Sequence, residues 1–179
     1  MKVVCVIPAY NEEKNIEPVI KGCKRYADAV IVVDDGSIDN TSNIARSSGA
    51  IVIRHPKNLG KGAALRTGFR EALKQNADII VVIDGDGQHN PDDIPKLIRT
   101  LLEKNADIVI GSRFLKKNIK GMPPQRILSN FLTTNILRLV FGLKITDSQC
   151  GFRAYTRSAI EKLIDFKDNK YAAETEILI

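Results

Sequence analysis

Residues 79–89 read Ile-Ile-Val-Val-Ile-Asp-Gly-Asp-Gly-Gln-His, and this stretch decides the fold class. Its first five residues are all β-branched, which is the pattern of a strand buried on both faces of a parallel sheet. The polar run that begins at Asp84 marks the carboxyl end of that strand. Because open parallel sheets bind ligands beyond the carboxyl ends of their strands, the sequence predicts a binding site at Asp84.

Apolar runs and helical patterns alternate on both sides of this stretch. We expect strands at 3–7, 29–33, 51–53, 79–83 and 108–110, and helices at 12–26, 40–48, 61–75, 91–104 and 125–141. Asn11 is a candidate N-cap for its helix, and Pro91 stands at a favourable first helical position. This alternation predicts an α/β protein with a mostly parallel central sheet flanked by helices. Residues 112–124 are expected to form a loop.

The composition is that of one ordinary globular domain. The chain has 179 residues, 44% of them hydrophobic, and a net charge of +6. The basic balance suggests an anionic partner or simply a well-solvated surface. Three cysteines match neither a disulfide framework nor a zinc site, which favours a reducing, cytoplasmic setting. The start of the chain reads as a strand rather than a signal peptide, and no apolar run reaches the roughly 18–20 residues of a membrane span.

Asp84 and Asp86 are the candidate metal ligands. In extended backbone, residues two apart point to the same side, and two adjacent carboxylates repel unless a cation or proton lies between them. Oxygen ligands of this kind suit Mg²⁺ or Mn²⁺, and Gln88 could add a neutral oxygen. His89 could also be a ligand, although we expect it to have a structural role next to the ligands. The alternative is a plain Asp-Gly turn.

Two further acidic loops follow the first and second expected strands. Asp34 and Asp35 could accept hydrogen bonds from a base or from ribose hydroxyls, and Glu12 could do the same. Each could also serve only as a turn, a cap or a first-turn acid. Three acidic loops are thus predicted to meet at one edge of the sheet.

The glycine-rich segment at 60–62 reads Gly-Lys-Gly and follows the third expected strand. It does not complete a P-loop, and a dinucleotide-binding fingerprint would have to lie after the first strand. We therefore interpret it as a loop that lets the backbone approach a ligand, with Lys61 as a phosphate contact.

At this point the motifs resemble those of family 2 glycosyltransferases. The matching segments are Val-Ile-Pro-Ala-Tyr-Asn-Glu-Glu at 6–13, Val-Asp-Asp-Gly-Ser at 33–37 and Asp-Gly-Asp-Gly-Gln-His at 84–89. The segments at 58–62, 111–113 and 147–153 are similar to those of dolichyl-phosphate mannose or glucose synthases. The resemblance covers nearly the whole chain and implies a single GT-A catalytic domain over 1–179, with a C-terminal part of the usual family length missing.

The resemblance also implies a reaction and a set of site residues. The reaction would be an inverting transfer of a hexose from GDP-mannose or a UDP-sugar to a polyprenyl or dolichyl phosphate, with Mg²⁺ or Mn²⁺. The residues implied around the nucleoside are Pro8, Tyr10, Asn11, Glu12, Asp35 and Asp84, and Asp86 and Gln88 would hold metal and diphosphate. The residues implied at phosphates are Arg113, Arg126 and Arg153. Asp147 would orient the acceptor or hold an arginine.

The stretch from 112 to 145 is basic and rich in apolar residues. No acidic residue occurs between Asp107 and Asp147, although seven lysines and arginines do. An amphipathic helix of this kind could face the acceptor and lie on the anionic cytoplasmic face of a membrane. The alternative is that its apolar residues pack on the sheet.

Three rival functions stay open at the level of sequence. One is a GT-A enzyme that glycosylates a saccharide or another small acceptor, although such enzymes usually need an acidic base. Another is a nucleotidyltransferase. The third is a non-catalytic, basic nucleotide- or nucleic-acid-binding module, which the low aromatic content of 6% disfavours. The sequence leaves the donor base, the sugar and the oligomeric state undetermined.

Overall fold

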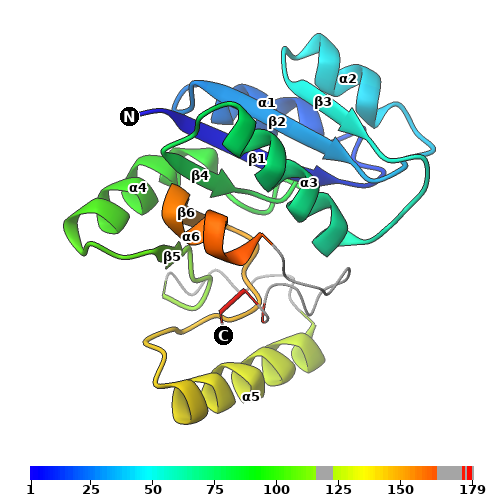
Figure 1. Cartoon of the computed structure of the whole chain (residues 1–179). Coiled ribbons are helices and arrows are strands. Elements are labelled where there is room, and N and C mark those ends of the chain that lie inside the picture. Colours follow the sequence, from blue (N-terminus) through cyan, green and yellow to red (C-terminus); the bar gives the residue numbers. More distant parts are fainter. Residues whose placement is uncertain (116–122, 165–174, 176, 179) are drawn as a thin grey trace.

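The computed structural model describes residues 1–115, 123–164, 175, 177 and 178, except for the side chain of Arg126. Its centre is a six-stranded sheet in the order β3-β2-β1-β4-β6-β5 (Figure 1). The strands are β1 (Val3–Ala9), β2 (Ala29–Asp34), β3 (Ile51–Arg54), β4 (Ile79–Val82), β5 (Ile108–Ile110) and β6 (Arg153–Thr156). All seven residues of β1 are buried, so this strand lies in the hydrophobic core.

The sheet is mostly parallel, as predicted. Strands β1, β2, β3 and β4 pair in parallel, whereas β6 runs antiparallel to both β4 and β5. Strand β6 was not predicted from the sequence. Its four residues, Arg-Ala-Tyr-Thr, contain no apolar run, and they follow directly on the polar loop at 147–152. Strand β6 places that loop next to the end of β4, because Arg153 pairs with Val82.

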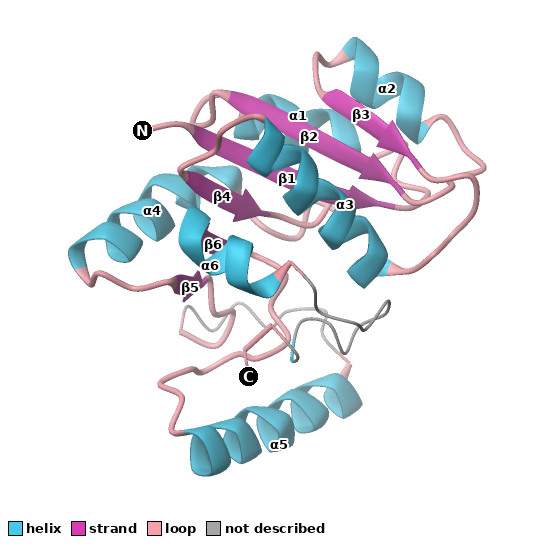
Figure 2. Ribbon diagram, viewed as in Figure 1, coloured by secondary structure: helices cyan, strands magenta, loops and turns pink. Residues whose placement is uncertain are grey.

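Helices cover both faces of the sheet (Figure 2). The helices beside the sheet are α1 (Ile16–Cys23), α2 (Thr41–Ser47), α3 (Lys61–Lys74), α4 (Ile94–Glu103) and α6 (Arg157–Leu163), and the remaining helix is α5 (Pro124–Phe141). The side chains of β1 alternate between two cores, as a strand buried on both faces requires. Val3, Cys5 and Ile7 pack with α1 and α4, whereas Val4 and Val6 pack with α3.

Two helix starts differ from the prediction. Helix α1 begins at Ile16 rather than at residue 12, and Asn11 is not its N-cap. Asn11 instead adopts a positive φ of 57°, a conformation that asparagine tolerates better than most residues. At the other site Pro91 opens a short 3₁₀ turn, Pro91–Asp93, in which the Asn90 side chain accepts a hydrogen bond from the Asp92 amide before α4 begins.

Helix α5 lies apart from the sheet in Figure 1 and has an unusual distribution of side chains. Asn130 and Thr134 are buried, whereas Leu139 is 86% exposed and Phe131 is 62% exposed. Leu128, Leu132, Ile136, Val140 and Phe141 are exposed as well. The alternative that its apolar residues pack on the sheet is therefore wrong for most of them. The helix is also not amphipathic in the expected sense, because polar groups occupy part of its buried side.

Candidate active site

A pocket of about 600 Å³ opens at the carboxyl ends of β1, β2 and β4, where the sequence predicted a site. Its lining comes from three acidic loops, from the loop before α3 and from the start of α3. The lining residues are Pro8, Ala9, Tyr10, Glu12, Asp35, Asn58, Leu59, Gly60, Lys61, Ala64, Asp84, Gly85 and Asp86. The structure thus gathers six of the seven predicted nucleotide-binding residues around one cavity.

Asn11 is the predicted nucleotide-binding residue that does not line this pocket. Its backbone amide donates to the Ser37 hydroxyl at 2.9 Å, and its side-chain oxygen accepts from the Ile38 amide at 2.9 Å. These two bonds tie the loop after β1 to the loop after β2. Asn11 therefore links two of the loops that line the pocket, and a direct contact with nucleotide stays a prediction.

Asp84 and Lys61 form an ion pair inside the pocket, with Nζ 2.7 Å from Oδ1. Burial by itself would raise the pKa of Asp84, but Lys61, together with His89 and Arg113, brings that pKa below its ordinary value. Asp84 is therefore a carboxylate at neutral pH. The Gly-Lys-Gly segment contributes this lysine because the backbone turns sharply at Gly60, whose φ is 98°.

Asp86 faces the same pocket, whereas Gln88 does not. The Asp86 Oδ1 accepts a hydrogen bond from the Gln88 amide at 2.9 Å, which fixes the turn. The Gln88 side chain lines a neighbouring cavity of about 410 Å³ together with His89 and Arg113. Among the described residues no cluster of three or more His, Cys, Asp or Glu side chains gathers at one point.

This donor set fits a divalent ion that is held in part by its substrate. Asp84 and Asp86 supply two carboxylates on one wall of the pocket. Mg²⁺ and Mn²⁺ commonly bind through one or two carboxylates and complete their coordination with water and substrate phosphate oxygens. The structure leaves Gln88 in the neighbouring cavity, so its role as a metal ligand stays a prediction.

Asp35 is held by a network that the sequence analysis missed. Its carboxylate accepts hydrogen bonds from the amides of Leu59 and Gly60 at 2.9 and 2.8 Å, and it lies 2.7 Å from Nδ1 of His55. The other ring nitrogen of His55 is 3.0 Å from the Thr67 hydroxyl on α3. Asp35 thus anchors the 57–60 loop, and no periodicity in the sequence pointed to His55 as its partner.

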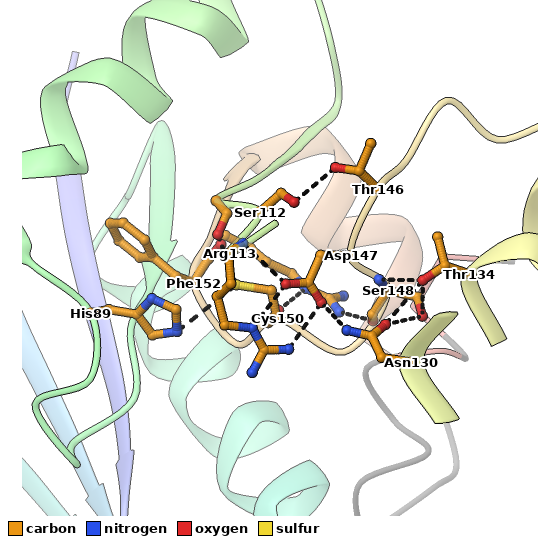
Figure 3. A network of polar contacts seen from close by, with 12 residues as sticks. His89, Ser112, Arg113, Asn130, Thr134, Thr146, Asp147, Ser148, Cys150 and Phe152 are labelled. Carbon is orange, nitrogen blue, oxygen red and sulfur yellow. Dashed lines mark hydrogen bonds and ion pairs between the residues drawn. The ribbon is translucent and has the colours of Figure 1, made fainter. Parts of the chain in front are cut away.

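Asp147 holds an arginine, which is one of the two roles expected of it (Figure 3). Nε of Arg113 donates to Oδ2 at 2.8 Å and a terminal nitrogen of Arg113 donates to Oδ1 at 2.9 Å. Asn130 on α5 donates to the same carboxylate at 2.5 Å. Burial would raise the pKa of Asp147, but these hydrogen bonds lower it below the ordinary value.

Thr134 extends this network along α5. Its hydroxyl lies 3.0 Å from the Ser148 hydroxyl and 3.0 Å from Oδ1 of Asn130, and the Ser148 amide donates to it at 3.1 Å. Asn130 and Thr134 explain why the buried side of α5 is polar, and their i, i+4 spacing inside an apolar helix was the available signal. The 147–148 loop therefore attaches α5 to Arg113.

Arg153 is buried and bonded to its own loop. Its Nε donates to the carbonyl of Cys150 and a terminal nitrogen to the carbonyl of Ser148, both at 2.7 Å. The guanidinium is 1% exposed. Arg153 thus holds the 148–150 backbone, and the phosphate contact implied for it stays a prediction. The side chain of Arg126, for which the same contact was implied, lies outside the described residues.

The 150–152 segment packs directly against the carboxylates. Gly151 lies so close to Asp84 that an added Cβ would fall 2.7 Å from the carboxylate carbon. The Cys150 thiol donates to the Gly111 carbonyl at 3.0 Å, and burial raises the pKa of that thiol to about 12. His89 packs its ring against Phe152 at 5.3 Å, and burial lowers the pKa of His89, so its imidazole is neutral at pH 7.

The family description "Glycosyl transferase family 2" matches residues 4–164. The chain belongs to glycosyltransferase family 2. The chain has the GT-A α/β fold, and it is a hexosyltransferase by its family. The resemblance drawn from the sequence motifs is thereby confirmed for the family and for the fold.

Individual relatives add detail to this assignment. The chain is 36% identical to the UDP-N-acetylglucosamine–dolichyl-phosphate N-acetylglucosaminyltransferase of Methanococcus voltae, over 99% of this chain and 78% of that one. It is 31% identical to the polyprenol monophosphomannose synthase of Mycolicibacterium smegmatis, over 90% and 64%.

A solved structure is similar over the same range. It is glucosyl-3-phosphoglycerate synthase from Mycobacterium tuberculosis in complex with Mn²⁺, UDP and glucosyl-3-phosphoglycerate. The TM-score is 0.76 at 26% identity, and the match covers 99% of this chain and 63% of that one. The family 2 chain described here thus spans between 63% and 78% of the length of these three proteins.

Proposed function

We propose that this family 2 domain moves a hexose from a nucleotide-sugar to a polyprenyl or dolichyl phosphate with inversion at the anomeric carbon. The observation that carries the proposal is that the hydrogen bonds of Asp147 link the region of the acidic pocket to the helix with the exposed apolar surface. The acidic pocket contains Asp84 and Asp86, and the exposed apolar surface belongs to α5. Asp147 binds both Asn130 on α5 and Arg113. Arg113 lines the cavity beside the acidic pocket, and its charge acts on Asp84.

The donor side of the proposal rests on the 600 Å³ pocket. Pro8, Tyr10, Glu12 and Asp35 line the part that would take the nucleoside, and Lys61 lies at the start of α3. A helix start favours anions because its free amides and its dipole are positive. Asp84 and Asp86 would hold Mg²⁺ or Mn²⁺. As a Lewis acid, the metal would neutralise the negative charge that develops on the leaving diphosphate.

The acceptor side needs positive charge more than a general base. A phosphate monoester has a second pKa of about 6 and is mostly ionised at neutral pH, so it already carries a nucleophilic oxygen. Asp84 is paired with Lys61, and Asp147 is paired with Arg113, which makes both poor candidates for removing a proton. Arg113 borders the cavity beside Gln88 and His89, where it would meet the acceptor phosphate.

The surface of α5 supports a lipid-linked acceptor and peripheral contact with the cytoplasmic face of a membrane. A cavity of about 600 Å³ runs along this helix, lined by Phe114, Ile127, Leu128 and Phe131 and bordered by Arg138. Exposed apolar patches with basic residues nearby are typical of membrane contact sites. The structure contains no bilayer-crossing helix in its described part. Lys116, Lys117 and Lys120 lie outside the described residues.

The test is transfer of radiolabelled sugar. GDP-mannose, UDP-glucose and UDP-N-acetylglucosamine are each supplied with Mn²⁺ and a short polyprenyl phosphate, and the organic-phase product is counted. We expect product from one donor and none from the Asp86→Ala variant, while Asp107→Ala, an exposed aspartate on the loop before β5, keeps wild-type activity. Absence of lipid product with all donors, alongside transfer to another acceptor, would contradict the acceptor assignment.

Membrane contact is tested separately by flotation with anionic vesicles. We expect Leu139→Gln to weaken binding, because Leu139 is 86% exposed on α5. Leu102→Gln is the matched control, since Leu102 is 53% exposed on a different helix, α4. Equal binding of both variants would argue against α5 as the contact surface.

A second candidate is transfer to a small phosphorylated acceptor. The likeness to glucosyl-3-phosphoglycerate synthase, whose structure holds glucosyl-3-phosphoglycerate, favours it. The same Arg113 cavity would then bind the phosphate of a water-soluble acceptor. Supplying 3-phosphoglycerate in place of polyprenyl phosphate separates the two, because only one of the reactions yields a product that partitions into butanol.

A further inference from the structure

Lys61 links two parts of the proposed donor site, the start of α3 and the carboxylate of Asp84. It is the first residue of α3, and its ammonium lies 2.7 Å from Oδ1 of Asp84. Both side chains are largely enclosed, with 18% and 23% of their surface exposed. The backbone before Lys61 is anchored, because the Gly60 amide donates to Asp35 at 2.8 Å. The side chain can therefore change partner while the loop stays in place.

The charges explain why a cation is needed there. Asp84 and Asp86 line one wall of the pocket, and neighbouring carboxylates repel each other unless a positive charge compensates them. Lys61 supplies one positive charge to Asp84. A divalent ion on the same carboxylate would supply two, but it would also repel an ammonium held within a few ångströms of it. Lysine and metal therefore compete for Asp84.

We propose that Lys61 is a resident counter-ion of Asp84 which is released to the donor diphosphate when metal and nucleotide bind together. This inference rests on the proposed donor site. In the free protein Lys61 neutralises Asp84 and disfavours binding of metal alone. When the diphosphate arrives, Lys61 gains a second anionic partner and leaves the carboxylate to the metal. Lys61 thereby couples the two ligands and favours their joint entry.

The experiment measures Mn²⁺ affinity with and without nucleotide. Free Mn²⁺ is followed by electron paramagnetic resonance in titrations of the wild type, Lys61→Gln, Lys61→Arg and Lys74→Gln, each alone and with saturating UDP or GDP. Lys74→Gln is the matched control, because it removes one charge from the exposed far end of the same helix. Circular dichroism and thermal unfolding establish that each variant is folded.

We expect Lys61→Gln to bind Mn²⁺ alone roughly tenfold more tightly than the wild type, a coupling within the usual range of roughly 5- to 150-fold. The gain in Mn²⁺ affinity on adding diphosphate should shrink correspondingly, whereas Lys61→Arg and Lys74→Gln should resemble the wild type. Unchanged or weaker Mn²⁺ binding by Lys61→Gln, with sugar transfer by the wild type intact, would overturn this inference alone. Absence of Mn²⁺ and diphosphate binding in every protein would overturn it together with the proposed donor site.

Discussion

Gly151→Ala is the substitution for which the structure makes the most specific prediction. The Cβ of an alanine at this position would lie 2.7 Å from both Cγ and Oδ1 of Asp84, and nearer still to Oδ2. An ordinary contact at that position begins near 3.4 Å, so the carboxylate has to retreat by about 1 Å to clear its nearest oxygen. Gly151 has no positive φ, which means that the effect is steric and does not arise from backbone strain.

The expected consequences follow from the partners of Asp84. Its ion pair with Lys61 at 2.7 Å would be disturbed, and overpacking of this kind costs about 1–3 kcal/mol in unfolding free energy. Because a misplacement of roughly 1 Å in a reacting site can cost about a hundredfold in rate, we expect sugar transfer to fall by about 10- to 100-fold. Binding of Mn²⁺ with UDP or GDP should weaken in parallel.

The assay compares Gly151→Ala with Gly142→Ala. The Cβ added at Gly142 meets no atom within 4 Å, but its φ is 66°, so this control carries backbone strain without a clash in the pocket. We expect Gly142→Ala to lose some stability while it keeps the wild-type affinity for metal and nucleotide. Wild-type nucleotide affinity and rate in Gly151→Ala would refute the reasoning that this glycine positions Asp84.

Three further predictions concern stability and the pocket. Asp147→Ala should lower the free energy of urea unfolding by about 3–5 kcal/mol, because it leaves Arg113 without its buried partner, whereas Asp107→Ala, at an exposed site, should change it by less than about 1 kcal/mol. The pKa values of Asp84 and Asp147 are both lowered in the folded state, so their contribution to stability is complete above the ordinary value of about 4 and is lost as the pH falls through their lower folded values. Urea midpoints measured from pH 7 to pH 2 should therefore drop mainly below pH 4, and a drop centred between pH 6 and pH 8 would contradict this. His55→Ala should weaken nucleotide binding and cost about 1–3 kcal/mol, because it removes a buried partner of the Asp35 carboxylate; unchanged thermal unfolding and affinity would count against that role.

Sequence patterns predicted the parts of the site that lie at the ends of recognisable strands. Asp35, Asp84 and Asp86 were placed correctly around one pocket, because each follows a β-branched run and parallel strands end at the same edge. The start of α1 was mispredicted, because residues 12–15 have helix-compatible identities but form a turn, in which the amides of Glu12 and Glu13 donate to the side chains of Thr41 and Asp39.

The remaining parts depend on partners that are distant in the sequence. Arg113 and Asp147 are 34 residues apart, and His55 and Asp35 are 20 residues apart, so no local periodicity connects them. Arg153 has the charge expected of a phosphate ligand, but the antiparallel pairing of β6 buries it below the loop. Charge can be read from the sequence, whereas the direction in which a side chain points is decided by the tertiary fold.

The most direct test of the account is calorimetric titration of UDP and GDP into the protein, with and without Mn²⁺, beside Asp86→Asn and Asp107→Asn. We expect metal-dependent binding of one nucleoside diphosphate at a single site, lost in Asp86→Asn and retained in Asp107→Asn, because Asp86 lines the pocket and Asp107 lies outside it. Nucleotide binding that ignores Mn²⁺ and survives Asp86→Asn would contradict it.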